Sequence, residues 1–446
     1  MYGIFVISRP SMKFIPSESE ILIRKVYIKI MREIQNAIPN SPAAILAWKR
    51  LWLLPLVLFT HSNEKGNVRS QIRTAAKRIM AGDWESFTLR SLVKRRKPVV
   101  QSSSVRLESK EHLITALLSI GQVSRAYSVL KSDNKGTIVI NDQCKDELKS
   151  LYPPRITDHG IDPQILRQIR EYRGHIRQDG FREASVDMFS KILMSKAKGI
   201  SGGLDQLRFE HLQKLWGFSD HPDQQELRIL LTYILNKIMY AEVPMVLRPL
   251  WADTATSVLR KPSGGMRPLG KLDVFRKLAA SALWLLNKGS IEEAFGNLQL
   301  GTQKLGAERI LHTLTITSEL YPDQCRFYPD GKNAFNNCSR DHAMKGIMEF
   351  CPEMAPFFLL IYGDSSKTWA LDEFDEIFSV DMHEGAQQGC TLGSLLCGLA
   401  TLPMVKALQE FITERGKAMF FCDDGNLMAP FPNMLQCMEY LNQEGP

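Results

Sequence analysis

The chain has 446 residues, of which 44% are hydrophobic and 23% are charged, and it contains 29 Gly and 22 Pro. These ordinary values exclude a wholly disordered chain, a collagen-like repeat and a coiled coil, and the length suffices for two or three domains. The eight cysteines form no C-x-x-C pair. They therefore predict neither a disulfide framework nor a zinc ribbon, and they favour a reducing compartment.

The net charge of +8 is distributed unevenly along the chain. Residues 1–100 hold 18 Lys and Arg against 6 Asp and Glu, a local net charge of +12, and the remaining residues sum to −4. This asymmetry predicts a basic N-terminal region that binds a polyanion, although a solvated basic face would have the same composition. The densest basic run, Lys94–Lys97, is compatible with a localisation signal or a linker.

The first residues, Met1–Pro10, lack the basic region and long apolar core of a secretory signal. The most apolar stretch, Leu51–Phe59, has nine residues, fewer than the ~20 that a membrane-spanning helix needs. It therefore predicts a buried helix or another core run in a soluble protein, and we expect no membrane partner.

Two boundaries divide the chain. A polar stretch at Gln101–Ser104 is typical of a linker, and a Pro-Pro pair closes a helical segment at 105–155. Three leucines of this segment are spaced for one helix face: Leu113, Leu117 and Leu118. We expect a basic helical region at 1–100, a helical connector at 101–155 and an α+β region at 156–446.

Within the α+β region, apolar periodicity predicts two helices, one over Leu204, Leu207, Leu212 and Leu215 and one over Leu227, Leu230, Leu231, Ile234 and Ile238. Strands at 256–261 and 267–271 flank a Gly-rich hairpin tip. Further helices are predicted at 272–288, 304–320, 334–350 and 391–411, and further strands at 325–328, 417–422 and 426–429. This mixture indicates an α+β fold with an antiparallel sheet.

Three short segments combine acidic and polar residues. Asp330 leaves a predicted strand just before a helix, Gly385–Gly389 is a polar turn that enters a helix, and Asp423-Asp424 lies at a hairpin tip. Adjacent acids in a hairpin are usually a surface turn. Together with a second strand-end Asp and a basic hairpin upstream, however, they favour metal-assisted phosphoryl transfer, which needs carboxylates that bridge two Mg²⁺ ions.

These segments resemble a known family. Asp330–Phe335, Gly385–Gly389 and Phe421–Asp424 are similar to the A, B and C palm motifs of reverse transcriptases. The first continues as Asn-Ala-Phe-Asn and then Ser-Arg, as is usual in retrotransposons without long terminal repeats. Three upstream segments resemble the first fingers motif, the fingers hairpin and a helix start of the same family: Gly202–Asp205, Arg260–Leu269 and Leu305–Arg309.

The resemblance implies the fingers and palm of a right-hand polymerase, with an antiparallel palm sheet. Asp330 and Asp423 would be the catalytic metal ligands, supported by Asp424, and two Mg²⁺ ions are expected. The implied reaction is attack of a primer 3′-hydroxyl on a deoxynucleoside triphosphate, directed by an RNA template, with release of pyrophosphate.

The same resemblance implies the substrate contacts. Lys261 and Arg267 would bind the incoming triphosphate, and Phe335 would crowd the sugar 2′ position and disfavour ribonucleotides. Gln388 and Gly389 would lie against the nascent base pair and the template. An RNA template with a DNA primer and deoxynucleoside triphosphates are therefore the expected partners, and the expected location is intracellular, in the nucleus.

Three features depart from the family pattern. Pro329 precedes Asp330 where a β-forming apolar residue is usual, Cys390-Thr391 replaces Asp-Pro, and the sequence ends 22 residues after Asp424. The last feature predicts a fragment or degenerate copy without a thumb. One alternative is therefore a catalytically inactive nucleic-acid-binding remnant of such an element. A second is an RNA-templated RNA polymerase, against which Phe335 argues.

Overall fold

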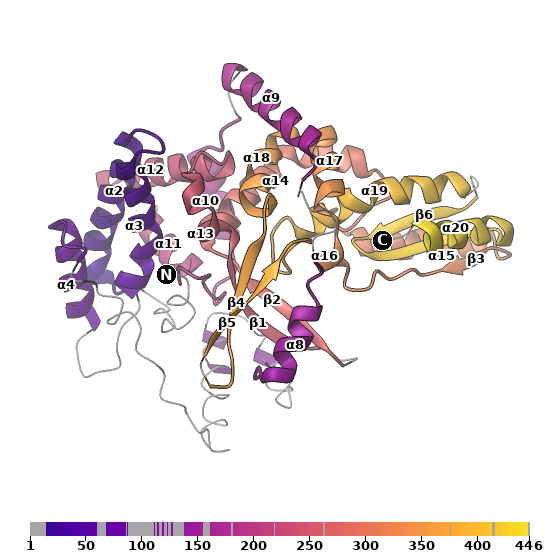
Figure 1. The fold of residues 1–446 in the computed structure, drawn as a ribbon, viewed down its shortest axis with the longest axis horizontal. Coiled ribbons are helices and arrows are strands. Elements are labelled where there is room, and N and C mark those ends of the chain that lie inside the picture. The colour runs from indigo at the N-terminus through magenta and orange to yellow at the C-terminus, as the bar shows by residue number, and fades with distance from the viewer. Residues whose placement is uncertain are drawn as a thin grey trace.

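Figure 1 shows the computed structural model of the chain, which is mainly helical and has two small sheets, the larger of which projects below most of the helices in this view. It describes residues 15–59, 68–85, 87, 138–154, 161–179, 182–217, 219–261, 264–374, 376–412 and 415–444, with isolated positions between 111 and 127. Lys94–Lys97, Gln101–Ser104, Leu113 and Leu117 lie outside these residues. The predicted boundaries near 100 and 155 therefore stay predictions.

Three helices of the N-terminal region pack together, drawn in indigo and violet in Figure 1: α2 (Glu20–Asn36), α3 (Pro42–Phe59) and α4 (Val68–Met80). The short 3-10 turn η1 (Ser17–Ser19) precedes them. Helix α3 is long and apolar enough to cross a membrane by length and composition. Its stretch Leu51–Phe59 is nevertheless buried at every position except Leu53, which is partly buried. The predicted buried helix is confirmed, and burial on all sides accounts for its composition.

The larger sheet has the order β2-β1-β4-β5. Strands β1 (Thr254–Arg260) and β2 (Met266–Lys271) form the predicted antiparallel hairpin. A second hairpin, β4 (Ser366–Leu371) and β5 (Ile377–Met382), was not predicted, and β4 pairs with β1 in parallel. This sheet is therefore mixed. Helix α8 (Asp142–Ser150) covers it through Leu148, which joins an apolar cluster on the strands.

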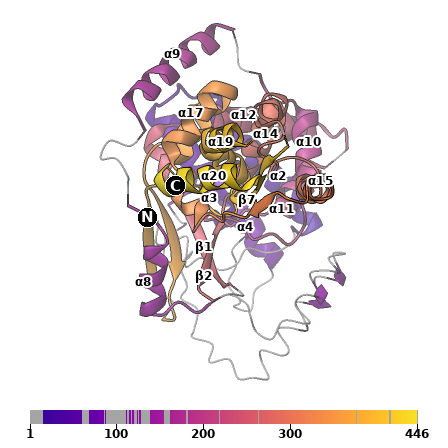
Figure 2. The same cartoon turned by 90° about the vertical axis from the view of Figure 1, so that its right-hand side faces the viewer.

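The smaller sheet has the order β3-β7-β6 and is antiparallel throughout, as predicted. Its strands are β3 (Cys325–Phe327), β6 (Lys417–Phe421) and β7 (Asp424–Ala429). Helices α19 (Gly393–Phe411) and α20 (Phe431–Glu444) pack against it through an apolar cluster. Figure 2 shows α19, α20 and β7 grouped together.

Pro329, which stands where the family pattern has a β-forming residue, lies two residues beyond the end of a strand. Strand β3 ends at Phe327, and β3 is an edge strand of the described sheet. The Pro329 carbonyl accepts a hydrogen bond of 2.9 Å from the Gly425 N–H, but the proline nitrogen has no hydrogen to donate in return. The proline therefore lies at the sheet edge, where a missing donor is tolerated.

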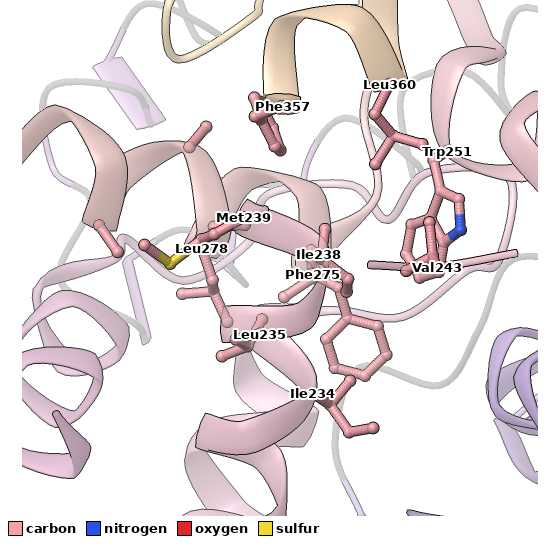
Figure 3. Close-up of a cluster of buried hydrophobic side chains, with 14 of the residues drawn as sticks. Ile234, Leu235, Ile238, Met239, Val243, Trp251, Phe275, Leu278, Phe357 and Leu360 are labelled. Atoms are coloured by element: carbon pink, nitrogen blue, oxygen red, sulfur yellow. The ribbon is translucent and has the colours of Figure 1, made fainter. Parts of the chain in front are cut away.

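The remaining described elements are α9 (Pro163–Asp179), α10 (Val186–Ser195), α11 (Phe209–Trp216), α12 (Pro222–Met239), η2 (Met245–Leu247), α13 (Arg248–Ala252), α14 (Val274–Phe295), α15 (Gly306–Leu320), α16 (Ala334–Asn337), α17 (Arg340–Phe350), η3 (Pro352–Met354) and α18 (Ala355–Tyr362). The main core runs without interruption from α2 and α3 into α12, α14 and α18. Figure 3 shows its centre, where side chains of four helices and the Val243 loop converge: Ile234, Leu235, Ile238, Met239, Val243, Trp251, Phe275, Leu278, Phe357 and Leu360.

Two predicted helices differ from the structure. Leu204 and Leu207 are buried, but they lie before α11 because the Asp205 carboxylate accepts the Leu207 N–H and Gln206 adopts a positive φ of 61°. The predicted helix at 334–350 is broken into α16 and α17. Its break is at Ser339, whose hydroxyl accepts the His342 N–H and caps a new helix.

Candidate active site

The tip of the β6–β7 hairpin carries two of the predicted carboxylates. Because Phe421 pairs with Asp424, Cys422 and Asp423 form a two-residue turn. Cys422 has a φ of 59°, in the left-handed region that a non-glycine residue seldom adopts. The turn leaves Asp423 half-buried and Asp424, the first residue of β7, exposed.

Asp330 reaches the same edge from a distant part of the chain. Its main chain pairs with that of Asp424 in an isolated antiparallel bridge, just beyond β3. Burial raises the pKa of the Asp423 carboxyl, and the charges of Asp424 and Asp330 raise this pKa further, whereas Arg267 lowers it. The three carboxylates therefore share one edge, with the Arg267 guanidinium of β2 in electrostatic range.

Asp330 and Asp424 are exposed at this edge, and Asp423 is half-buried. Among the described residues, no three acidic, histidine or cysteine side chains are grouped closely enough to hold a metal together. Mg²⁺ prefers oxygen ligands and takes few carboxylates, because water and phosphate complete its coordination. The oxygen donors of the carboxylates and the negative charge around Asp423, which Arg267 offsets only in part, are therefore compatible with Mg²⁺, and the three-aspartate ligand set stays a prediction.

The segment after Asp330 is held by two asparagines. Asn333, with a φ of 55°, precedes α16, and the side-chain amides of Asn333 and Asn336 both donate to the Leu151 carbonyl. Phe335 is half-buried, and its ring lies against Gly393 at the start of α19. Core packing thus accounts for part of the Phe335 environment.

The loop Gly385–Gly389 interlocks with this segment and with β2. Gly385 N–H donates to the Cys338 carbonyl (3.0 Å), and Ala386 N–H donates to the Phe335 carbonyl (2.7 Å). At the other end of the loop, the Gln388 carbonyl accepts the Gly270 N–H of β2 at 2.8 Å. The loop therefore connects the Asp330 segment to the strand that carries Arg267.

Arg340 and Tyr362 form a buried centre behind this loop. The Arg340 guanidinium donates to the main-chain carbonyls of Gly385, Tyr362, Asp364, Met382 and Glu384. The Tyr362 hydroxyl accepts both the Gln387 N–H and an Arg276 Nη2–H. The Ser-Arg pair noted in the sequence therefore serves as a helix cap and a buried clamp.

No protein-family model matches the chain. Over 259 residues it is 25% identical to the retrotransposable element SLACS 132 kDa protein of Trypanosoma brucei gambiense, a match that covers 57% of this chain and 21% of that protein. The chain is similar to part of a retrotransposable-element protein. It spans about a fifth of the relative's length. The match supports the retrotransposon part of the resemblance and does not test the reverse transcriptase part.

The predicted substrate-binding residues are placed as follows. Arg267 is exposed on β2 near Asp423, and Gln388 and Gly389 adjoin the end of the same strand. Lys261 lies at the hairpin tip, where its N–H donates to the Gly265 carbonyl, and no contact among the described residues joins its side chain to the carboxylates. The roles of all these residues, including Phe335, stay predictions.

Two residues of the buried centre were missed from the sequence. Tyr362 ends the apolar run Ala355–Tyr362, whose composition predicts only a core helix. Arg276 lies inside a predicted helix. The signal in the sequence was Arg276 itself, an arginine within an apolar helical pattern, because a charge buried there needs buried partners.

Proposed function

We propose that the chain carries the fingers and palm of an RNA-directed DNA polymerase of the type found in retrotransposons without long terminal repeats. The observation that supports this most is the bridge between Asp330 and Asp424, which brings distant acidic segments together around Asp423. Arg267 beside them and the relationship to a retrotransposable element agree with it.

In this proposal Asp330 and Asp423, supported by Asp424, would hold two Mg²⁺ ions. Bound there, the metal would activate the primer 3′-hydroxyl and offset charge on the phosphates. The 3′-oxygen would lose its proton to solvent as it bonds to the α-phosphorus, and the bond from the α-phosphorus to the pyrophosphate oxygen would break, so that pyrophosphate leaves. Arg267 and Lys261 would neutralise the triphosphate, because cations placed at phosphoryl oxygens stabilise the developing charge.

Phe335 and the Gly385–Gly389 loop would select the nucleotide. Gly389 has a φ of 97°, and a side chain there would collide with the Gly270 carbonyl of β2. This close packing would hold Gln388 and Gly389 in a fixed position beside the base pair. Phe335, five residues after Asp330, would exclude a ribose 2′-hydroxyl by its bulk.

The test is nucleotide addition to an oligo(dT) primer on poly(rA), with dTTP and UTP compared by kcat/KM. The wild type should prefer dTTP, and Phe335→Val should reduce that preference about tenfold or more, because small changes of pocket shape discriminate on this scale. Phe350→Val, at a half-buried phenylalanine of α17, is the matched control and should leave the ratio unchanged. An unchanged ratio in folded Phe335→Val would return Phe335 to the core, and no dTTP addition by the wild type would favour the inactive remnant.

A further inference from the structure

A buried glutamine holds the turn that precedes Asp423. Gln299 is 1% exposed and lies between α14 and α15. Its Oε1 accepts the N–H groups of Cys422 (2.8 Å) and Gly301 (3.1 Å), and its Nε2 donates to the Cys422 carbonyl (3.0 Å). One side-chain amide therefore satisfies both main-chain polar groups of Cys422.

Cys422, the residue that Gln299 holds, has a strained main-chain conformation. Cys422 adopts a positive φ without being glycine, a conformation that persists only when its surroundings determine it. The main chain around Gln299 adds to the constraint, because Leu300 N–H donates to the Phe420 carbonyl (2.7 Å) and Phe420 N–H donates to the Leu298 carbonyl (2.8 Å). Residues 298–300 thus run beside β6 and present Gln299 to the turn.

The fit at this point is close. A side chain at Gly301 would collide with both the Sγ and the N of Cys422. Cys422 is 6% exposed, so neither of its main-chain groups can exchange Gln299 for bulk water. Loss of the amide would leave a buried N–H and a buried carbonyl without partners, which favours a different turn conformation.

We propose that Gln299 is a positioning residue that sets the direction of the Asp423 carboxylate and thereby the affinity of this edge for a divalent cation. This inference rests on the proposed function, because it assigns Asp423 to a metal ion. Gln299 itself touches neither metal nor nucleotide; it acts through the Cys422 peptide groups.

The experiment measures Mn²⁺ binding by electron paramagnetic resonance in the full chain, with amide hydrogen exchange across residues 419–425. Gln299→Met keeps the length of the side chain and removes its hydrogen bonds. It should weaken Mn²⁺ binding about tenfold, the usual cost of losing support behind a metal ligand, and expose the Cys422 amide to exchange. Gln299→Glu keeps the acceptor and, when its carboxyl is ionised, loses the donor, so in that form its affinity should be intermediate.

Gln303→Met is the matched control, since Gln303 also donates to main-chain carbonyls, those of Gly296 and Gln299, but does not reach the turn. It should bind Mn²⁺ as the wild type does. Asp423→Asn gives the affinity of a chain without this ligand. If Gln299→Met makes the Cys422 amide exchange faster while Mn²⁺ affinity is unchanged, Gln299 is merely structural and the inference fails.

Absence of Mn²⁺ binding by the wild type, or equal binding by the wild type and Asp423→Asn, would also overturn the inference. The failure of the proposed function is separate: the wild type would then bind Mn²⁺ through Asp423 and still add no nucleotide. If Gln299→Met does not fold, Gln299→Glu decides, and wild-type affinity and exchange in that variant would overturn the assignment.

Discussion

At the scale of single residues, a buried carboxyl pair joins the N-terminal helices to the rest of the chain. Asp205 and Asp273 are 0% and 3% exposed, and the Trp52 indole N–H of α3 donates to Asp273 at 3.2 Å. Burial raises the pKa of both carboxyls, and their mutual repulsion raises that of Asp205 further. The segment Gly202–Asp205 therefore has a packing role at the start of α14.

This pair predicts a pH-dependent contribution to stability. The pKa of Asp205 is higher in the folded chain than in the unfolded chain. The resulting contribution to stability is therefore fully present below the ordinary aspartate pKa, and it is lost as the pH rises through the raised pKa. Asp205→Asn stays neutral at every pH. The free energy of unfolding of the wild type should therefore fall relative to Asp205→Asn as pH rises, by at most about 1.4 kcal/mol per pH unit for one proton.

Urea unfolding of both proteins between about pH 5 and pH 8 measures this difference. The charged and titratable groups around the carboxyl are Asp273, Lys277, Arg276 and Tyr27, and they are unchanged in the variant. Asp323→Asn, at an exposed aspartate, should show no pH-dependent difference from the wild type. A pH-independent difference for Asp205→Asn would mean that Asp205 is not protonated in the folded chain.

At the scale of elements, the loop Gly385–Gly389 and helix α16 depend on a close backbone contact. Gly385 has a φ of 75°, and a Cβ there would collide with the Asn336 carbonyl oxygen. The atoms that the Cβ would meet belong to the main chain of Asn336, so no side-chain rotation can relieve the collision. The interlock of the two segments therefore needs glycine at this position.

Gly385→Ala should lower the free energy of unfolding by about 2–4 kcal/mol, because both backbone strain and overpacking act on the same residue. The control is Gly289→Ala, in α14, where a Cβ meets nothing within 4 Å. It should stabilise the chain by about 0.5–1 kcal/mol through helix propensity. Chemical denaturation of both variants decides, and a Gly385→Ala chain as stable as the wild type would contradict the interlock.

The sequence predicts those elements whose signals are local. The hairpins β1–β2 and β6–β7 each combine alternating strands with a short turn, and both were found as predicted. The β4–β5 hairpin was missed because its place is set by parallel pairing with β1, more than a hundred residues away, which no local pattern encodes. The helix at 334–350 was over-extended because a Ser cap outweighed continuous apolar periodicity.

In the candidate site, too, some residues could be predicted from the sequence and others could not. The sequence places Asp330 and Asp423-Asp424 beside predicted strands, and the structure brings these segments to one edge, next to strands β3 and β7. The supports of the site could not be predicted, since Gln299, Arg340 and Tyr362 act through main-chain carbonyls and N–H groups of distant loops. Such partners are determined by tertiary packing, which one sequence does not reveal.

At the scale of the whole molecule, the basic region is continuous with the core and still presents cations outward. Helix α2 packs against α12, and Ile72 and Ala76 bury one side of α4. On its other side, Arg73 and Lys77 are exposed four residues apart, on one helix face. This face belongs to the basic region, and we propose that it binds RNA.

Arg73→Gln with Lys77→Gln should weaken binding of single-stranded RNA independently of its sequence. The slope of log K against log salt should fall by about 0.7 for each phosphate contact removed. A control with equal charge loss is Lys191→Gln with Lys345→Gln, at exposed lysines of α10 and α17. Fluorescence titrations at several salt concentrations measure both slopes, and equal slopes for the two double variants would show that α4 is a solvated face.

The central claim is that Asp423 belongs to a metal-dependent nucleotidyl-transfer site, and single-nucleotide addition tests it most directly. The assay uses an oligo(dT) primer on poly(rA) with dTTP and Mg²⁺, and it compares the wild type with Asp423→Asn and with Asp323→Asn. We predict Mg²⁺-dependent addition by the wild type and by Asp323→Asn. Asp423→Asn should lose at least about tenfold in rate, since the carboxylate's contribution through the metal is worth several kcal/mol. A smaller loss in folded Asp423→Asn, or no addition by the wild type, would contradict the claim.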